Sequence, residues 1–375
     1  MKITWCTTRR MANDMCATTQ YALMTGLNNG AFELEVLGPD IPIEEHAWSH
    51  KKLDYKKMKG FNNSSLAKSM LRYLKKNMTS KCILIIEWPL LSTLGKFAEK
   101  NKIPWVCLDR SPPADVGIFG TLQWIFWKRA WKQVSRSIQR GGFCLGGTVV
   151  SEAHREYVRS RFKISENEIC VLHAGFNQKD FQPREKINEA KEELHLVYHG
   201  RLDRHRGIMM LPLLLDKLSE ENIPARLHLY GEGDCDKTLT SLSSSGRNLT
   251  LHGKKDHRQI CKELGRYHIG LLPMPNQFVW TLASPIKRSE YLAANLCIIG
   301  VNHSGHQLEN LGEAPWFRLI PQQGFVQFAF DEIKSMLSEN IFRTVGTEPR
   351  AYADKYFKWN IITSEFHDWL LNKPE

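Results

Sequence analysis

The chain has 375 residues, of which 42% are hydrophobic and 24% are charged, and its formal net charge is +11. This length allows two domains with separate cores, and the ordinary apolar fraction excludes a disordered chain. Nine scattered cysteines without a C-x-x-C pair exclude a disulfide-stapled miniprotein and favour reduced thiols in the cytoplasm. The longest apolar runs fall far short of the roughly 20 residues that a membrane-spanning helix needs. The first residues have the pattern of a strand rather than of a secretory leader.

The positive charge is confined to one half of the chain. Residues 1–180 contain 27 Lys and Arg against 16 Asp and Glu, whereas residues 181–375 contain 24 of each class. A basic half indicates an anionic partner, which can be nucleic acid, a lipid surface or a phosphorylated substrate.

Short β-rich runs alternate with helical patterns along the chain, which predicts an α/β fold with mainly parallel sheets. In the first half we expect strands at 2–6, 32–37, 82–87, 105–108, 148–150 and 168–172, and helices near 17–28, 64–77, 91–101, 121–140 and 152–162. In the second half we expect strands at 194–199, 226–230, 249–252, 269–272 and 297–300, and helices near 207–220, 236–244, 256–265 and 285–294.

The domain organisation follows from a polar stretch at 178–193, which has the character of a linker. The simplest topology is therefore two successive doubly wound domains, at 1–182 and 183–348. A final helical stretch at 349–375 is amphipathic and carries several aromatic residues. It could cross back to the first domain or pack on the second domain alone.

The strongest local motif is L-V-Y-H-G-R-L-D-R-H-R-G, from Leu196 to Gly207. A buried strand ends at Gly200, a short loop follows, and a helix begins near Gly207. Ligands of open α/β sheets bind at the carboxyl ends of strands, and helix N-termini attract anions. Four arginines, at 201, 204 and 206 in the loop and at 226 on a neighbouring strand, carry guanidinium groups that suit phosphate oxygens. The alternative is a solvated loop with surface arginines.

The next two strands also end in residues that suit a ligand. One ends at Gly231 and Gly233 in the sequence G-E-G, where the small residues let a ligand approach the backbone closely. The other ends in L-H-G-K, which places His252 and Lys254 at the same edge of the sheet.

The last motif of this half is S-P-I-K-R-S-E-Y-L-A, which begins at Ser284. Pro285 fits the first turn of a helix, and Lys287 and Glu290 share one face of that helix because they are three residues apart. A carboxylate one turn into such a helix can accept both hydroxyls of a ribose, while the helix start directs amide groups at phosphates.

Taken in order, the motifs G-R-L-x-x-x-R-G, L-x-L-Y-G-E-G, L-H-G-K, I-G-L-L-P and S-P-x-K-x-x-E-Y-L-A resemble the C-terminal half of a GT-B glycosyltransferase. They are most similar to family 4 of the retaining enzymes. The resemblance covers about residues 145–305, and residues 1–145 agree only in the alternation of strands and helices. It implies two Rossmann-like domains that face each other across a cleft, with the acceptor on the first and a nucleotide sugar on the second.

The resemblance also assigns roles. Arg201 and Arg206 would bind the diphosphate of a nucleotide sugar, and Glu290 would hold the ribose. The other donor-binding residues would be Gly200, Gly231, Gly233, His252, Lys254, Ser284, Pro285 and Lys287. Family members commonly have a second glutamate eight residues before Glu290, where this chain has Leu282. Trp280, Thr281 or backbone groups would then contact the donor sugar.

We expect neither a cofactor nor a metal. Asp234 and Asp236 match the D-x-D of metal-dependent glycosyltransferases, but they follow the G-E-G turn, where aspartate favours the start of a helix. His195 and His199 are four residues apart in an expected strand, which separates them by about 13 Å. His303 and His306 flank a Ser-Gly turn, and loop histidines without cysteine or carboxylate partners are more often ordinary residues than metal ligands.

Candidate acceptor-binding residues follow the strands of the first half. Arg9 and Arg10 come after the first strand, Glu87 and Trp88 lie at the end of the third, and Asp109 and Arg110 come after the fourth. Asp109 is the best candidate for a general base or an anchor of the acceptor hydroxyl. Its alternative role is to cap the loop before the Ser-Pro-Pro turn.

The segment 117–151 contains five basic residues and no acidic one. Its tryptophans recur on one helical face, with the cations largely elsewhere. Apolar, tryptophan-rich surface beside cations is typical of a helix that lies at a membrane interface. The residues expected at the membrane are Trp124, Trp127, Lys128, Trp131 and Lys132. The alternative is a helix packed in the core whose polar face is basic.

The sequence therefore predicts a glycosyltransferase that moves a sugar from a nucleoside diphosphate to an acceptor hydroxyl, with retention implied by the family resemblance. The expected partners are a nucleotide sugar, a lipid-linked sugar or glycolipid, and an anionic membrane surface, at the cytoplasmic, inner face of a membrane. The alternatives are a nucleotide-sugar 2-epimerase of the same fold, an inactive glycosyltransferase-like subunit and a nucleic-acid-binding protein. Nucleic acid is disfavoured because no binding module for it appears.

Overall fold

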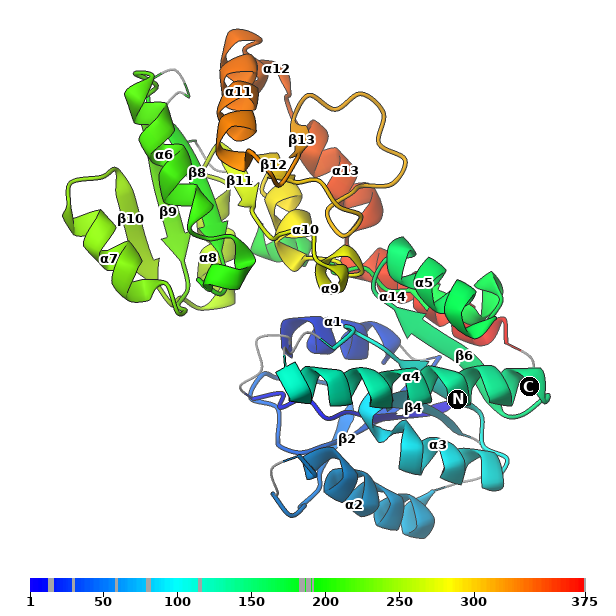
Figure 1. The fold of residues 1–375 in the computed structure, drawn as a ribbon. Helices are drawn as coiled ribbons and strands as arrows, with labels where there is room; N and C mark the ends of the chain where they lie inside the picture. The colour runs from blue at the N-terminus through cyan, green and yellow to red at the C-terminus, as the bar shows by residue number, and fades with distance from the viewer. Residues whose placement is uncertain are drawn as a thin grey trace. The chain divides into compact units, whose positions relative to one another are not determined.

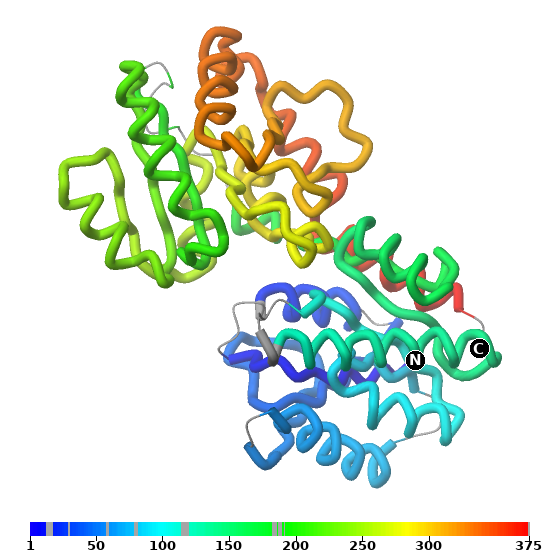
Figure 2. Tube along the Cα trace, in the orientation of Figure 1, coloured from blue at the N-terminus to red at the C-terminus, as the bar shows by residue number. Residues whose placement is uncertain are grey.

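The computed structural model of the protein (Figure 1) describes residues 1–12, 17–28, 31–57, 60–78, 82–113, 117–181, 186, 190 and 192–373. The chain divides into two compact units. Unit 1 comprises Met1–His173 and Trp359–Glu375, and unit 2 comprises Ala174–Lys358. In the trace of Figure 2, the red C-terminal segment lies among the elements of unit 1.

Unit 1 is built on a parallel sheet with the strand order β3-β2-β1-β4-β5-β6-β7. The strands are β1 (Lys2–Cys6), β2 (Glu33–Gly38), β3 (Ser49–Lys52), β4 (Cys82–Glu87), β5 (Trp105–Leu108), β6 (Cys144–Val149) and β7 (Ile169–Val171). The helices are α1 (Ala17–Leu27), α2 (Asn62–Asn77), α3 (Leu91–Lys100), α4 (Gly117–Gln139), α5 (Glu152–Phe162) and α14 (Trp359–Leu371).

The alternation of side chains along β4 explains how this sheet is covered. Leu84 and Ile86 join a core with α2, α3, α4 and α5, whereas Ile83 and Ile85 join a second core with α1 and α14. Every residue of β4 is therefore buried, as expected for a parallel strand with helices on both faces.

Unit 2 repeats this plan with the strand order β10-β9-β8-β11-β12-β13. The strands are β8 (Leu194–His199), β9 (Ala225–Tyr230), β10 (Leu249–Gly253), β11 (Ile269–Leu272), β12 (Cys297–Val301) and β13 (Phe317–Ile320). The helices are α6 (Met210–Glu220), α7 (Asp236–Ser244), α8 (His257–Leu264), α9 (Phe278–Thr281), α10 (Ile286–Ala293), α11 (Phe325–Ser338), α12 (Ile341–Thr344) and α13 (Glu348–Tyr356). In both sheets the order reverses beside the first strand, as in Rossmann folds.

The predicted α/β architecture with two doubly wound, parallel sheets is confirmed. The expected strands at 2–6, 82–87, 105–108, 194–199 and 269–272 have the observed bounds. The edge strands β3 and β13 and the helix α11 were not predicted. Among the described residues, no helix has the length and apolar character needed to span a bilayer.

The expected domain limits need correction. The boundary between 182 and 183 lies outside the described residues, and the chain divides instead between His173 and Ala174. The expected single C-terminal helix is two helices, because the chain is extended at Lys358, which pairs with Phe176. Helix α13 stays in unit 2, whereas α14 packs against α1 in unit 1.

Candidate functional site

The ends of β8 and β9 bring two backbone segments into contact, next to the point between β8 and β11 where the sheet order of unit 2 reverses. Gly200 and Gly231 both adopt positive φ angles, of 119° and 129°. A Cβ atom on Gly231 would lie 1.9 Å from the carbonyl oxygen of Gly200. Only glycine permits this approach, so the motifs G-R-L and G-E-G meet at one edge of the sheet.

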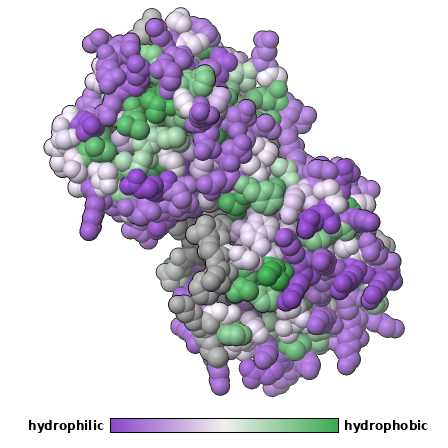
Figure 3. Space-filling view, in the orientation of Figure 1, coloured by the Kyte–Doolittle hydropathy of each residue, from purple (hydrophilic) through white to green (hydrophobic). Residues whose placement is uncertain are grey.

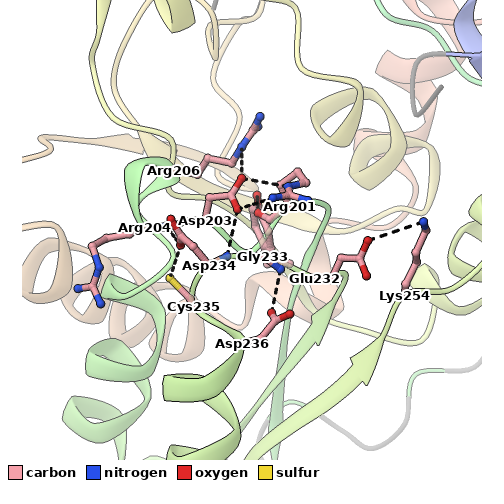
Figure 4. Close-up of polar contacts among 11 residues, drawn as sticks. Arg201, Asp203, Arg204, Arg206, Glu232, Gly233, Asp234, Cys235, Asp236 and Lys254 are labelled. Atoms are coloured by element: carbon pink, nitrogen blue, oxygen red, sulfur yellow. Dashed lines mark hydrogen bonds and ion pairs between the residues drawn. The ribbon is translucent and has the colours of Figure 1, made fainter. Parts of the chain in front are cut away.

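Two arginines of this edge converge on one carboxylate (Figure 4). Arg201 Nε and Nη2 donate to the two oxygens of Asp203 at 3.1 and 2.9 Å, and Arg206 Nε lies 3.6 Å from Asp203 Oδ2. Burial opposes ionisation of Asp203, but the interactions with Arg201, the amide of Asp234 and Arg206 together outweigh burial and lower the pKa of the carboxyl. Asp203 thus holds two guanidinium groups together at the end of β8.

Arg206 is fixed from a second side by an aromatic ring. Its guanidinium lies 4.8 Å from the ring centroid of Trp280, on the short helix α9. The turn that presents Arg206 ends at Gly207 (φ 77°), where a Cβ atom would lie 2.3 Å from the carbonyl oxygen of Pro273. Arg206 is therefore held in place rather than free on the surface, contrary to a solvated loop.

Asp234 and Asp236 are acceptors for backbone amides (Figure 4). Asp234 Oδ1 accepts from the amide of Arg204 at 2.7 Å, and Asp236 Oδ1 accepts from the amide of Gly233 at 2.9 Å. Each carboxylate thus stabilises a turn of the site, which accounts for the D-x-D pattern without a metal. Lys254, expected near the base, is exposed and lies 3.7 Å from Glu232.

The helix α10 directs two charged side chains towards the end of β8. Lys287 is buried against the space left open by the missing Cβ of Gly200, and its ammonium lies 5.2 Å from the ring centroid of Tyr198. Glu290 lies one turn further along α10. The same helix is anchored at its start, because Ser284 Oγ accepts from the amide of Ala174 at 3.1 Å, and Pro285 is its N-cap.

Glu290 is a buried carboxylate between two histidines. His199 Nε2, at the end of β8, lies 3.0 Å from Glu290 Oε2, and His257 Nε2 contacts Oε1. Burial would raise the pKa of Glu290, but the imidazoles hold it far below its usual range. Burial alone would lower the pKa of His257, but the interaction with Glu290 outweighs burial and raises this pKa to about 8. Sequence analysis identified Glu290 but missed both histidine partners.

A row of histidines crosses β8, β9 and β10 beside this site. His195 Nδ1 lies 2.9 Å from His228 Nε2, and His228 Nδ1 lies 3.1 Å from His252 Nε2. The ring of His252 stacks on Tyr230, with ring centroids 4.1 Å apart. His252, expected to line the base, is therefore part of a stacked polar layer on the sheet.

This row should make the stability of unit 2 sensitive to acid. Burial, together with His195, His252 and Arg226, lowers the pKa of His228 from 6.5 to about 3, and the ring of Tyr267 packs against it. The unfolded chain binds this proton near pH 6.5, so stability is fully present above that pH and falls as the pH drops towards 3. We expect a loss of about 1 kcal/mol per pH unit, measured by urea unfolding between pH 7 and 5. His228→Gln should flatten the slope, and an unchanged slope would contradict the assignment.

Leu282 stands where the related family commonly has its first glutamate, and it is buried, with 4% of its surface exposed. In place of the contact that this glutamate would make with the donor sugar, the structure offers the α9 turn with Trp280, whose ring faces Arg206. His205 also stacks on Trp280, with ring centroids 6.4 Å apart.

Asp109 in unit 1 is placed differently from the expectation. It is fully buried, and its Oδ2 accepts hydrogen bonds from Trp127 Nε1 at 2.5 Å and from Trp131 Nε1 at 2.9 Å. His154 Nε2 lies 3.4 Å from the same oxygen. A carboxylate enclosed in this way anchors α4 and α5 to the end of β5, so the structure corrects the interpretation of Asp109 as a general base.

The expected membrane face of α4 also needs correction. Trp127 and Trp131 have no exposed surface, because their indole N–H groups turn inward to Asp109. Trp124 and Lys128 are half-buried and Lys132 is exposed. The apolar side chains that α4 exposes are Leu122 (45%), Ile125 (41%) and Phe126 (52%). The helical periodicity identified a tryptophan face, but that face packs in the core.

The expected acceptor residues lie at the carboxyl ends of β1 and β5. Arg10 is exposed, and the amide of Arg9 donates to Thr7 Oγ1 at 3.0 Å. Arg110 Nη1 donates to the carbonyl of Leu172 at 2.6 Å. The loop after β1 is organised by another strand-end candidate, Glu87 at the end of β4, which accepts hydrogen bonds from the Thr7 and Thr8 side chains at 2.6 Å each.

Neither a protein-family model nor a curated protein sequence matches the chain. Solved structures match it over almost its whole length. Sucrose-phosphate synthase from Thermosynechococcus elongatus gives a TM-score of 0.73 at 16% identity, over 99% of this chain and 98% of that one. HepE from Anabaena, solved in complex with UDP and glucose, gives 0.72 at 12% identity, over 99% and 100% of the two chains.

A third similar structure is WaaG, a glycosyltransferase involved in lipopolysaccharide biosynthesis, with a TM-score of 0.69 at 12% identity over 99% of this chain and 100% of that one. Identities this low establish a shared fold. Together with the two reversed parallel sheets, they show that the chain has the GT-B fold of glycosyltransferases, as its motifs predicted.

Proposed function

We propose that the protein is a glycosyltransferase that transfers a sugar from a nucleoside diphosphate sugar, with UDP as the first nucleotide to test, to an acceptor hydroxyl. The observation that carries the proposal is the convergence of Arg201 and Arg206 on Asp203 at the reversal point of the unit 2 sheet. Lys287 adds a third cation at the end of β8. Similar structures include one solved with UDP and glucose and several glycosyltransferases.

The arrangement suits a diphosphate leaving group. As the acceptor oxygen bonds to the anomeric carbon, the bond from that carbon to the diphosphate breaks, and the hydroxyl proton passes to the departing phosphate. The nucleoside diphosphate gains negative charge in this step. Fixed guanidinium groups stabilise that charge without reorganising, which is the usual source of catalytic electrostatics. Arg201 and Arg206 would exchange part of their contact with Asp203 for contacts with the phosphate oxygens.

The other roles follow from position. Glu290 would accept the ribose hydroxyls once the nucleotide displaces the contact with His257, which is the more exposed of its two partners. Gly200, Gly231 and Gly233 would let the diphosphate approach the backbone closely. Retention of configuration is proposed on the family resemblance of these motifs. Arg9, Arg10 and Arg110 at the strand ends of unit 1 would receive the acceptor.

The proposal is tested by screening nucleotide sugars for thermal stabilisation and then for release of nucleoside diphosphate in the presence of sugar acceptors. A donor at 100 times its dissociation constant should stabilise the protein by about 2.7 kcal/mol. Absence of binding by every nucleotide sugar would contradict the proposed site. Binding without turnover would indicate an inactive subunit, and an altered sugar without an acceptor would indicate an epimerase.

We also propose that α4 binds an anionic bilayer at the cytoplasmic face, where a lipid-linked acceptor would be presented. Leu122, Ile125 and Phe126 supply exposed apolar surface at one end of the helix. A groove of about 980 Å³ between α3 and α4 continues from it at Phe126. Its lining includes one acidic residue, Glu99, and six basic residues, Lys96, Lys100, Arg129, Lys132, Arg136 and Arg140. In Figure 3, apolar side chains gather on this side of unit 1 next to a polar area.

The bilayer proposal predicts a local charge effect. Arg129→Glu with Lys132→Glu should release the protein from vesicles that contain anionic lipid, because each basic residue near such a surface contributes about 1 kcal/mol. Lys51→Glu with Lys52→Glu is the matched control, since it changes the net charge equally at exposed positions on β3. Cosedimentation with vesicles measures both. If both variants lost binding equally, net charge alone would explain the loss. The proposal that α4 is a specific membrane-binding face would then be contradicted.

A further inference from the structure

A histidine, a cysteine and a glutamate meet in unit 2 in a cluster of which the glycosyl transfer proposed above uses only the glutamate. His257 and Cys261 are four residues apart and share one face of α8, and Glu290 reaches them from α10. One ligand atom of each residue lies within 4.8 Å of those of the other two. His257 Nε2 is 3.5 Å from Cys261 Sγ and contacts Glu290 Oε1.

The burial of the cluster distinguishes it from an ordinary surface ion pair. Cys261 is 2% exposed and Glu290 is 1% exposed, whereas the His257 side chain is about one-third exposed. The cluster therefore has two enclosed ligands and one at the solvent boundary. An ion can enter past the imidazole, and a water molecule can complete its coordination.

The ligand chemistry is that of a borderline-soft divalent cation. Imidazole, thiolate and carboxylate are all ligands of Zn²⁺, whereas Mg²⁺ and Ca²⁺ prefer oxygen alone. With bonds of about 2.0 Å to nitrogen and about 2.3 Å to sulfur, a tetrahedral site separates nitrogen from sulfur by about 3.5 Å. The observed separation of His257 Nε2 and Cys261 Sγ is 3.5 Å. His257 Nε2 and Glu290 Oε1 are in direct contact, closer than the roughly 3.3 Å between such ligand atoms of a tetrahedral ion, so the carboxylate must move back when an ion enters. Three protein ligands leave the fourth position of such a site to water.

His199 supplies the outer contact that such a site usually has. Its Nε2 lies 3.0 Å from Glu290 Oε2, the oxygen that does not face His257. Groups that hold a metal-binding carboxylate in this way orient it and raise the affinity of the site. His199 is a positioning residue, because it acts through Glu290.

We propose that His257 Nε2, Cys261 Sγ and Glu290 Oε1 form a binding site for Zn²⁺ or a chemically similar divalent cation, with His199 orienting the carboxylate. On binding, the thiol releases its proton to solvent and the sulfur forms the bond to the metal, so no oxidant or reductant takes part. If Glu290 holds the ribose of a donor, as the proposed function has it, the metal and the donor compete for this carboxylate.

The test is a titration of the whole protein with Co²⁺, in the absence of any nucleotide sugar. Wild type should show a thiolate-to-cobalt charge-transfer band that saturates at one equivalent and disappears when Zn²⁺ is added. Cys261→Ser should abolish the band. Cys235→Ser is the matched control, because Cys235 is a buried thiol that contacts Asp234 outside the cluster, and it should leave the band unchanged.

Two further variants keep the proposal falsifiable if Cys261→Ser does not fold. His257→Gln, at the more exposed ligand, should also lose tight Co²⁺ binding. His199→Asn should weaken Zn²⁺ affinity by about 10–100-fold while keeping the charge-transfer band, a result that a purely structural role would not give. Absence of the band in wild type, or a band that persists in both Cys261→Ser and His257→Gln, overturns the proposal. Since no donor is present, the outcome does not depend on glycosyl transfer.

Discussion

Arg206→Ala is expected to lower the rate of glycosyl transfer by about 10²–10³-fold while the fold persists. The guanidinium is held between Asp203 and the Trp280 ring, at 3.6 Å from a carboxylate oxygen and 4.8 Å from the ring centroid. It is thus oriented before the diphosphate arrives. Its loss removes stabilisation of charge that develops only during the reaction, so the turnover number should fall more than the Michaelis constant rises.

The control for this prediction lies two residues away. Arg204 belongs to the same short turn, but its side chain points away from Asp203 (Figure 4) and is exposed. Arg204→Ala changes the net charge equally and should retain most of the activity. Arg206→Lys, which keeps the positive charge, should recover part of the rate. Wild-type turnover in Arg206→Ala would remove this residue from the donor site.

Asp109→Ala is expected to lower the free energy of unfolding of unit 1 by about 3–5 kcal/mol. The substitution leaves the buried indole N–H groups of Trp127 and Trp131 without their acceptor, and each unsatisfied donor costs about 1–3 kcal/mol. A small cavity adds to this loss. Urea unfolding, followed by tryptophan fluorescence, measures the change.

Asp109→Asn is the matched variant, because its amide oxygen can still accept one hydrogen bond at nearly the same volume. It should destabilise unit 1 by less than the alanine substitution does. If Asp109→Ala were as stable as wild type but inactive, the residue would belong to the chemistry and not to the core.

The strands whose bounds could be predicted from sequence carry a largely apolar run, because a parallel strand covered on both faces is buried along its length. β4 and β8 are examples, and all their residues are buried. β3 is S-H-K-K, with three of its four residues exposed. It lies at the sheet edge and pairs with β2 alone, so backbone pairing forms it and its side chains carry no signal.

Prediction of the site from the sequence had the same limit. Arg201, Asp203 and Arg206 interact within one short loop, and their motif could be recognised locally. His257 and Glu290 are 33 residues apart, and only the packing of α8 beside α10 brings them together. The prediction that the tryptophans of α4 face a membrane was wrong for a related reason. Helical periodicity identifies an apolar face, but whether that face meets lipid or protein depends on Asp109, 18 residues before Trp127.

The return of the chain to unit 1 sets an order for assembly during synthesis. Unit 2 is one continuous segment, so its core can close as soon as that segment has left the ribosome. Unit 1 cannot close so early, because Trp359, Ile362 and Phe366 of α14 fill the core on the α1 face of its sheet. That face of the unit 1 sheet therefore stays uncovered until α14, which follows unit 2 in the chain, has been translated, whereas domains usually close in the order of their synthesis.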